Sequence, residues 1–145
     1  MNHNQKLSFE KILGSQRQKI ILFELLKKRK YNISHSQIPD INLHNKFVEN
    51  HPYKEWFIVF QNKKEIGTFY IKHDNSIGLN LMKQTKENIQ LILDYINSKF
   101  SPNKEISSLV PPYFYLNISS DNFELQAILE ELEIYKLQIS YKIQK

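Results

Sequence analysis

Three short apolar segments near the middle of the chain constrain its fold more than any other feature of the sequence. They are Trp56–Phe60, Ile66–Ile71 and Ser76–Met82, and they are rich in the aromatic and β-branched residues that favour strands. Polar turns separate them, first Asn62-Lys63 and then His73-Asp74-Asn75. Asn and Asp suit such turns because they tolerate left-handed backbone and bond their own main chain. The sequence therefore predicts an antiparallel three-stranded meander.

Helical patterns precede this meander. Apolar residues recur at near-helical spacing over Gln16–Lys28, and a shorter helical piece is expected around Ser8–Leu13. A second helix is expected to begin after Asp40, a suitable N-cap residue, and to end at Pro52. Its expected buried positions are Ile41, Leu43, Phe47 and Val48. Between the two helices, Tyr31–Ser34 has the pattern of a short strand.

The part of the chain after the meander alternates helical and strand patterns. A helix is expected over Lys86–Lys99, and the near-continuous apolar run Tyr113–Ile118 is typical of a strand buried on both faces. Asp121 and Glu124 have capping-box spacing and are expected to start the last helix. From Tyr135 to Ile143 apolar and polar residues alternate, which predicts a half-exposed strand. The expected inward positions of the two helices are Ile89, Ile92, Leu93 and Ile96, and Leu125, Ile128, Leu129 and Leu132.

This order of elements predicts an α/β fold. An antiparallel meander followed by a strand–helix–strand passage implies an α-β-α sandwich, in which helices cover both faces of a mixed, mostly antiparallel central sheet. A length of 145 residues suits one domain with a core of its own. We expect a single domain over 1–145, with an N-terminal helical segment at 1–30 and a core at 31–143.

The composition excludes several classes of function. The chain has no cysteine, which excludes disulfides, thiolate metal sites and a cysteine nucleophile. Its net charge is +5, but 18 of its 20 basic residues are Lys, whereas proteins that read nucleic acid rely on Arg. No apolar run approaches the roughly 20 residues of a membrane-spanning helix, and no secretory leader is visible. We therefore expect a cytoplasmic protein whose partners are neither nucleic acid nor membrane.

Three histidines are the side chains best suited to proton transfer. His35 follows the expected short strand, and His44 and His51 lie in and after the second helix. Histidine titrates near neutral pH, so His35 is a candidate general base, and His44, His51 and Tyr53 are candidates for a substrate pocket. Each histidine can instead serve to cap or hydrogen-bond a loop. Their spacings of nine and seven residues differ from those of zinc motifs, so we expect no metal.

Three longer passages carry a further signal. The first runs from Asn32 to His51-Pro-Tyr-Lys-Glu-Trp56, and the second runs from there through Glu65-Ile-Gly-Thr-Phe-Tyr-Ile71 to Leu79. The third runs from Tyr115-Leu-Asn117 through Asp121-Asn122 to Tyr141. Together they resemble the GNAT family of acyl-CoA-dependent N-acetyltransferases over most of Tyr31–Ile143. The resemblance implies that the α/β sandwich is a GNAT-like one.

The resemblance also implies an activity and a set of binding residues. The implied reaction transfers an acetyl group from acetyl-CoA to a primary amine of a small molecule, for example an amino sugar, with His35 or a water as the base. The family holds the pantetheine arm of the donor on the main chain of its fourth strand, and holds the pyrophosphate in the loop that follows. The implied donor-binding residues are Leu79, Leu81, Lys83, Gln84, Thr85, Lys86, Asn117 and Asn122.

The sequence departs from the family's pattern at two places. Glu87 and Ile89 stand where the phosphate loop has small residues, so this loop is degenerate. Leu129 stands where members carry a tyrosine that protonates the departing thiolate, while Tyr135 and Tyr141 have the alternation of core residues. Two hypotheses stay open. The chain is either an active N-acetyltransferase or a catalytically degenerate GNAT-fold binding module without normal acetyl-CoA binding.

Overall fold

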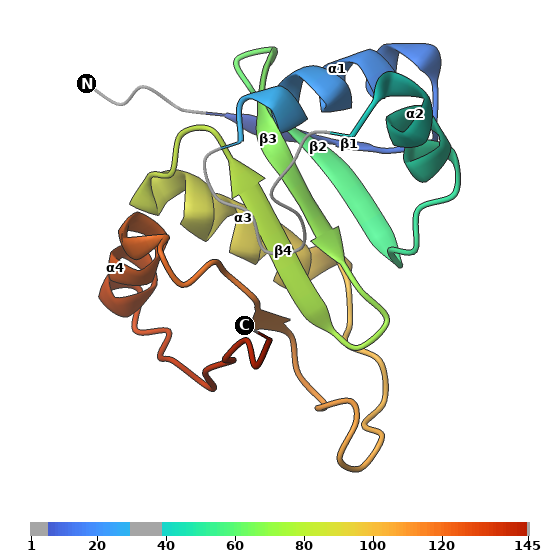
Figure 1. Ribbon diagram of the computed structural model, residues 1–145. Helices are drawn as coiled ribbons and strands as arrows, with labels where there is room; N and C mark the ends of the chain where they lie inside the picture. The colour runs from blue at the N-terminus through green and yellow to red at the C-terminus, as the bar shows by residue number, and fades with distance from the viewer. Residues whose placement is uncertain (1–5, 30–38, 145) are drawn as a thin grey trace, which may run out of the picture.

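The computed structural model describes residues 6–29 and 39–144. In these ranges the strands are β1 (Leu7–Lys11), β2 (Glu55–Gln61), β3 (Lys64–Ile71), β4 (Ser76–Leu81) and β5 (Tyr115–Leu116). The helices are α1 (Gln16–Lys27), α2 (Ile41–Glu49), α3 (Lys86–Lys99) and α4 (Phe123–Glu131). The strands form a sheet in the order β1-β2-β3-β4-β5, in which every neighbouring pair is antiparallel except β4 and β5 (Figure 1).

The central meander forms as the sequence predicts. Asn62 and Lys63, which join β2 to β3, have φ values of 51° and 67°. Two successive left-handed residues form the type I′ hairpin turn, whose twist matches that of the strands. In the second turn the buried Asn75 donates from its side chain to the carbonyls of Asn103 and Pro111, at 3.0 and 2.8 Å. This turn therefore ties the loop between α3 and β5 to the sheet.

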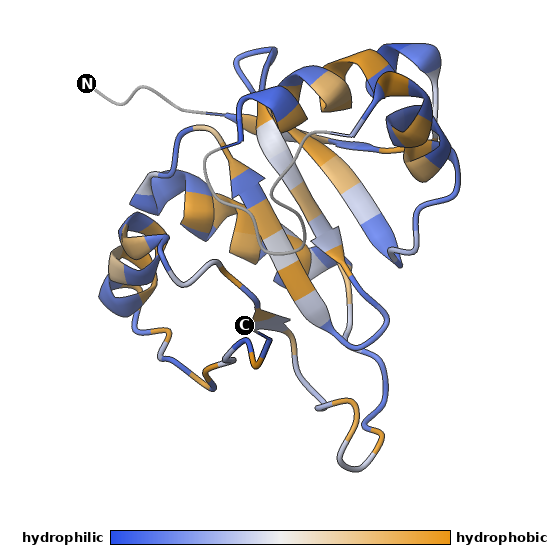
Figure 2. Ribbon diagram, in the orientation of Figure 1, coloured by the Kyte–Doolittle hydropathy of each residue, from blue (hydrophilic) through white to orange (hydrophobic). Residues whose placement is uncertain are grey.

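Helices cover both faces of the sheet, which confirms the predicted sandwich. Alternate residues of a strand face opposite sides. Phe57 and Phe69 lie in the core shared with α3 and α4, whereas Trp56 and Ile58 lie in the core shared with α1 and α2. Figure 1 shows α1 and α2 on one side of the sheet and α3 on the other. In Figure 2 apolar residues gather along the central strands and along α1 and α3.

α2 forms where predicted but buries fewer residues than expected. Asp40 caps it by accepting a hydrogen bond from the Leu43 N–H at 2.9 Å. Val48 is buried, but Ile41, Leu43 and Phe47 are 45%, 59% and 43% exposed, so their predicted burial is wrong. Leu43 and Phe47 line an open pocket, described below, and this is why a helical apolar stripe does not become core here.

The helical piece expected around 8–13 is wrong, because residues 7–11 form β1. Leu7 and Phe9 pack against the core beneath α3, and the ring of Phe9 stacks on that of Tyr95 with their centroids 4.0 Å apart. β1 pairs with β2, so its main-chain groups are satisfied by an existing sheet edge. Over five residues the apolar pattern is too short to distinguish a strand from a helical turn.

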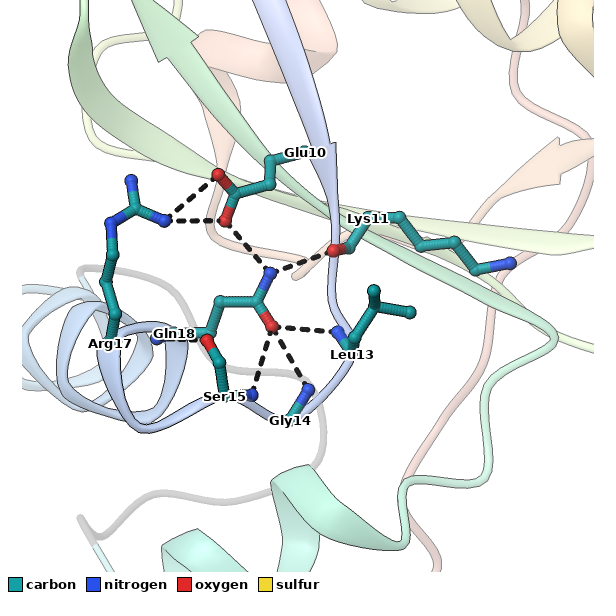
Figure 3. A network of polar contacts seen from close by, with 7 residues as sticks. All are labelled: Glu10, Lys11, Leu13, Gly14, Ser15, Arg17 and Gln18. Atoms are coloured by element: carbon teal, nitrogen blue, oxygen red, sulfur yellow. Dashed lines mark hydrogen bonds and ion pairs between the residues drawn. The ribbon is translucent and has the colours of Figure 1, made fainter.

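A buried glutamine turns the chain from β1 into α1 (Figure 3). The side-chain oxygen of Gln18 accepts hydrogen bonds from the main-chain N–H groups of Leu13, Gly14 and Ser15. Its nitrogen donates to the Glu10 carboxylate at 2.9 Å and to the Lys11 carbonyl at 2.8 Å. The Ser15 hydroxyl accepts the Gln18 N–H, which completes a capping box. One amide thus satisfies the polar groups of a tight connection.

Of the two strands expected near the C-terminus, one is shorter than predicted and the other does not form. The run 113–118 contains only the two-residue strand Tyr115–Leu116, which is half-buried. Residues 135–143 form no strand, and Tyr135 and Tyr141 are 74% and 80% exposed, so their expected core packing is wrong. Alternation makes a segment suitable for pairing, but a strand also needs an edge of matching length. β5 presents an edge of only two residues.

Candidate functional site

β4 and β5 are paired at one end and separate at the other. They pair over Ser76–Ile77 and Tyr115–Leu116, and the N–H of Asn117 donates to the carbonyl of Ile77 at 3.2 Å. Beyond this point β4 continues to Leu81, while the chain after β5 leaves towards α4 (Figure 1). The sheet therefore opens into a V between the two strands, which we call the splay.

The direction of the main-chain groups in β4 decides what faces the splay. Successive residues of a strand point their N–H and C=O groups to opposite edges. The Ile77 carbonyl bonds across the closed end of the splay, and the Met82 N–H bonds a carbonyl of residue 66 on the β3 side. The main-chain groups of Leu79 and Leu81 therefore face the open side. Within residues 39–144, no main-chain hydrogen bond joins them to the chain beyond β5.

A pocket of about 390 Å³ lies beside β4 on the side of the sheet that α1 and α2 cover. Its size is within the range of small-molecule sites. Apolar side chains from α1, α2 and β2 make up much of its lining. Lys28 and Arg29 contribute polar groups from the end of α1, and Gln84 and Asn122 contribute them from the segments that precede α3 and α4.

An aromatic wall forms one side of this pocket. The ring of Tyr53 stacks on that of Tyr70 with a centroid distance of 4.1 Å, and Trp56 meets Tyr53 edge to face at 5.2 Å. Gly78 is the register partner of Tyr70 in β4, and a Cβ atom there would lie 2.2 Å from the Tyr70 ring. The missing side chain at Gly78 therefore lets the Tyr70 ring lie directly against β4, where the splay begins.

Burial changes the ionisation of the polar groups in this region. It raises the pKa of Tyr53 to about 12 and also raises the pKa of Tyr70, so both phenols keep their protons at neutral pH. Burial lowers the pKa of Arg29, whose guanidinium is near both phenols, but an arginine stays charged at neutral pH. The pocket therefore combines an apolar lining with two neutral phenols and the positive charges of Lys28 and Arg29.

Two side-chain amides connect the arms of the splay. Gln84, which follows β4, donates from Nε2 to Oδ1 of Asn122 at 3.0 Å, and Asn122 donates from Nδ2 to Oε1 of Gln84 at 3.1 Å. Gln84 also donates to the Glu124 carboxylate at 2.9 Å. The buried Asn122 is the N-cap of α4 and accepts the N–H of Leu125 at 3.2 Å. The pair thus links the loop before α3 to the start of α4.

Four residues separate the end of β4 from the N-terminus of α3. Thr85 caps it by accepting the N–H of Asn88 at 3.1 Å. The main-chain N–H groups of Lys86 and Glu87 belong to the first turn and have no partner within the helix. Lys83 and Lys86 add exposed positive charge, and Lys86 also lies 3.9 Å from a carboxylate of α4. Main-chain donors and lysines together make this end of α3 suitable for an anion.

Two other kinds of site are absent from the described ranges. No group of three or more His, Cys, Asp or Glu side chains is placed to hold a metal ion. No helix there has the length and apolar character needed to cross a membrane.

Known structures superpose on most of this chain. Neither a scan against models of protein families nor a search of curated proteins gives a match. A domain from Methanocaldococcus jannaschii superposes with a TM-score of 0.62 at 12% identity, over 90% of this chain and 88% of that one. Campylobacter jejuni N-acetyltransferase PseH superposes with a TM-score of 0.57 at 13% identity, over 91% of each chain. Aminoglycoside N-acetyltransferase AAC(6')-Iy, in complex with CoA, superposes with a TM-score of 0.58 at 11% identity, over 100% of this chain and 98% of that one.

The chain has the GNAT fold. The superpositions establish the fold, but at such low sequence identity they do not establish the reaction. The reaction is therefore argued from the site. Most of the residues that the sequence predicted around acetyl-CoA surround the splay of this GNAT fold. Leu79 and Leu81 face it with main-chain groups, Lys83, Thr85 and Lys86 lie at the start of α3, and Gln84 pairs with Asn122. The exposed Asn117 is outside the pocket lining, although its main chain forms the last bond between the two arms.

The structure describes two of the three candidate histidines, His44 and His51. His35 lies outside the described residues. His44 is buried in the pocket lining, and its Nε2 lies 3.0 Å from the carbonyl of Lys19. A carbonyl only accepts, so Nε2 carries the hydrogen and Nδ1 has a free lone pair, while burial lowers the pKa of the ring. His51 lies outside the lining, and its Nδ1 accepts the N–H of Tyr53 at 3.2 Å, which fits the loop-bonding alternative.

Arg29 and Tyr70 are among the pocket residues that the sequence interpretation missed. The basic run 27–30 is typical of a helix C-terminus, and this explanation covers Arg29 together with its lysine neighbours. The sequence interpretation therefore did not single out Arg29 as a pocket residue. One signal was available, since Arg29 is one of only two arginines in a lysine-rich chain. For Tyr70 the signal was Gly78, because a glycine inside a strand often marks a close approach by another group.

Proposed function

We propose that this GNAT-fold chain is an N-acetyltransferase that transfers an acetyl group from acetyl-CoA to a primary amine of a small molecule, such as an amino sugar. The observation that carries the proposal is the splay, where the main-chain groups of Leu79 and Leu81 that face it have no main-chain partner within residues 6–29 and 39–144, beside a pocket of small-molecule size. The names of two structural neighbours, PseH and AAC(6')-Iy, support the reaction class. The pocket supports a small acceptor.

The residues around the splay fit the donor at two places. An extended, amide-rich arm can bond the free edge of Leu79 and Leu81 as an added strand would. The N-terminus of α3, with Lys83 and Lys86, fits a pyrophosphate. Because no glycine lies in residues 82–89, lysine charge replaces part of the main-chain cradle. When bound there, the donor supplies the thioester whose carbonyl carbon is attacked.

The chain's own groups can then move the protons. The N–H of Leu79 or Leu81 polarises the carbonyl oxygen, since a fixed main-chain donor stabilises charge that develops there. The proton of the attacking amine passes to His35 or to a water, and Nδ1 of His44 can accept from such a water. Tyr70, whose pKa is raised by burial, keeps a proton that it can give to the departing sulfur. Tyr70 thereby takes the role that buried Leu129 cannot perform.

A second candidate is a GNAT-fold binding module that transfers nothing. The Gln84–Asn122 pair favours it, because both amides are already satisfied across the open end of the splay. Glu87, in the first turn of α3, adds a carboxylate where a phosphate would bind. Such a module would bind a ligand in the pocket without acetyl-CoA.

Donor binding and turnover separate the two candidates. The melting temperature is measured with increasing acetyl-CoA, and free thiol is then measured after addition of a panel of primary amines. Acetyl-CoA at 100 times its dissociation constant should raise the unfolding free energy by roughly 2.7 kcal/mol.

The double variant Lys83→Gln/Lys86→Gln should lose most of this shift. The control Lys63→Gln/Lys64→Gln, in the exposed β2–β3 hairpin, should keep it. No shift at millimolar acetyl-CoA would contradict the transferase and favour the module.

A further inference from the structure

The pocket contains a cation that no acidic group neutralises within residues 6–29 and 39–144. Arg29 lies in the pocket lining near the phenols of Tyr53 and Tyr70. No ion pair or side-chain hydrogen bond joins it to another residue in those ranges. The other arginine behaves differently, because Arg17 is exposed and donates to both carboxylate oxygens of Glu10, at 3.0 and 2.9 Å. Among the described residues, the guanidinium of Arg29 therefore has no carboxylate partner, in contrast to that of Arg17.

The described lining of this pocket carries positive side chains and no acidic side chain. Lys28 and Arg29 belong to its described lining, which includes no Asp or Glu. The sequences 1–5 and 30–38 contain no Asp or Glu either, so the segment that follows Arg29 adds no carboxylate side chain. A partly buried guanidinium without a counter-charge is unfavourable, so an anion that enters the pocket gains a strong interaction.

The shape of the site restricts the ligand further. The planar guanidinium matches the two oxygens of a carboxylate or phosphate, which it binds through paired hydrogen bonds. The stacked rings of Tyr53 and Tyr70 lie near it in the same lining, so a ligand bound to Arg29 also has aromatic side chains beside it. Tyr70 also lies against Gly78 of β4, at the start of the splay. A ligand bound to Arg29 and this wall therefore lies beside the place proposed for transfer.

We propose that the acceptor is a small amine that also carries an anionic group, a carboxylate or a phosphate, which binds Arg29 while the amine faces the splay. This inference rests on the proposed function and adds the substrate class to it. It also sets the chain apart from its aminoglycoside-acetylating neighbours. A polycationic acceptor needs acidic residues in its pocket, whereas Lys28 and Arg29 would repel it.

Four matched amines test the proposal with the full chain. Glucosamine is the acceptor without an anion, glucosamine 6-phosphate adds a phosphate, muramic acid adds a carboxylate, and kanamycin is polycationic. Their dissociation constants are measured by calorimetry without donor, and their acetylation is measured separately as thiol release from acetyl-CoA. At least one anionic amine should bind tenfold or more tightly than glucosamine, and kanamycin should be the weakest. The stronger of the two anionic amines identifies the anion.

The variant Arg29→Gln tests the role of the side chain. Loss of hydrogen bonds to a charged group should reduce the ratio of anionic to neutral affinity by roughly 10- to 100-fold. The melting temperature without ligand should stay the same or rise, because an unpaired cation has been removed. Arg29→Lys should restore only part of the ratio, since a lysine cannot form the paired contact. The control Arg17→Gln should keep the full ratio.

The outcomes distinguish this proposal from the proposed function. Equal binding of glucosamine and both anionic amines, preferred binding of kanamycin, or an unchanged ratio in Arg29→Gln would overturn the anionic acceptor. Acetylation of glucosamine alone would overturn it too, while upholding the transferase. Arg29-dependent binding of an anionic amine without any acetylation would support the anion site and overturn the transferase.

Discussion

Gln18 joins β1 to α1 through a single buried amide, which accepts from three main-chain N–H groups and donates to two oxygens. Gln18→Leu keeps a similar volume but removes the partner of these partly buried main-chain donors. We expect the free energy of unfolding to fall by roughly 2–3 kcal/mol. Urea unfolding measures this change. Gln16→Leu, at the exposed first position of α1, is the matched control and should shift stability by less than about 0.5 kcal/mol.

Gly78 is the residue on which the shape of the pocket depends most directly. In Gly78→Ala the new methyl group would lie 2.2 Å from the Tyr70 ring, so this ring and the Tyr53 ring stacked on it must move. Such overpacking should cost about 1–3 kcal/mol of stability and weaken ligand binding in the pocket. Adding Tyr70→Ala removes the clash, so the double variant should be more stable than the sum of the single effects predicts. Strictly additive effects would contradict the contact.

At the scale of elements, β4 has two chemically different edges. Leu81→Pro removes an N–H that faces the splay, whereas Asn80→Pro removes one that faces β3. Proline is tolerated in strands only where no ladder hydrogen bond is lost. We therefore expect Leu81→Pro to remain folded but to lose acetyl-CoA binding, and Asn80→Pro to be the more destabilised of the two. Circular dichroism and the acetyl-CoA thermal shift measure both effects, and donor binding retained by Leu81→Pro would contradict the role of this edge.

The sequence predicts the elements well where local and tertiary preferences agree. α3 begins and ends at the predicted residues, and its four predicted inward residues are all buried. The predicted meander forms because its turn residues and strand patterns favour the same pairing. Prediction was wrong at β1 and at 135–143, because pairing there depends on the presence or absence of an edge contributed by a distant part of the chain.

At the scale of the whole molecule, buried histidines make stability depend on pH. Burial lowers the pKa of His44 and of His51 in the folded state, while in the unfolded chain each returns to about 6.5. The unfolded state therefore binds more protons as the pH falls below about 6.5, so the free energy of unfolding decreases there. Urea unfolding between pH 8 and pH 5 should show this slope. It should be smaller in His44→Gln/His51→Gln than in the control His73→Gln, at an exposed turn.

The sequence by itself determined the strands and helices of the centre, their turns and caps, and the apolar faces that place helices on both sides of the sheet. Those features depend on neighbouring residues, so periodicity and turn chemistry suffice to predict them. Only the tertiary structure decided that β4 and β5 separate after residue 77, that Gln84 meets Asn122, and that Arg29 lies beside Tyr53 and Tyr70. These contacts join residues far apart in the chain, and no local preference encodes them. The site forms because the packing of helices on the two faces brings such residues together beside the part of β4 that β5 does not pair.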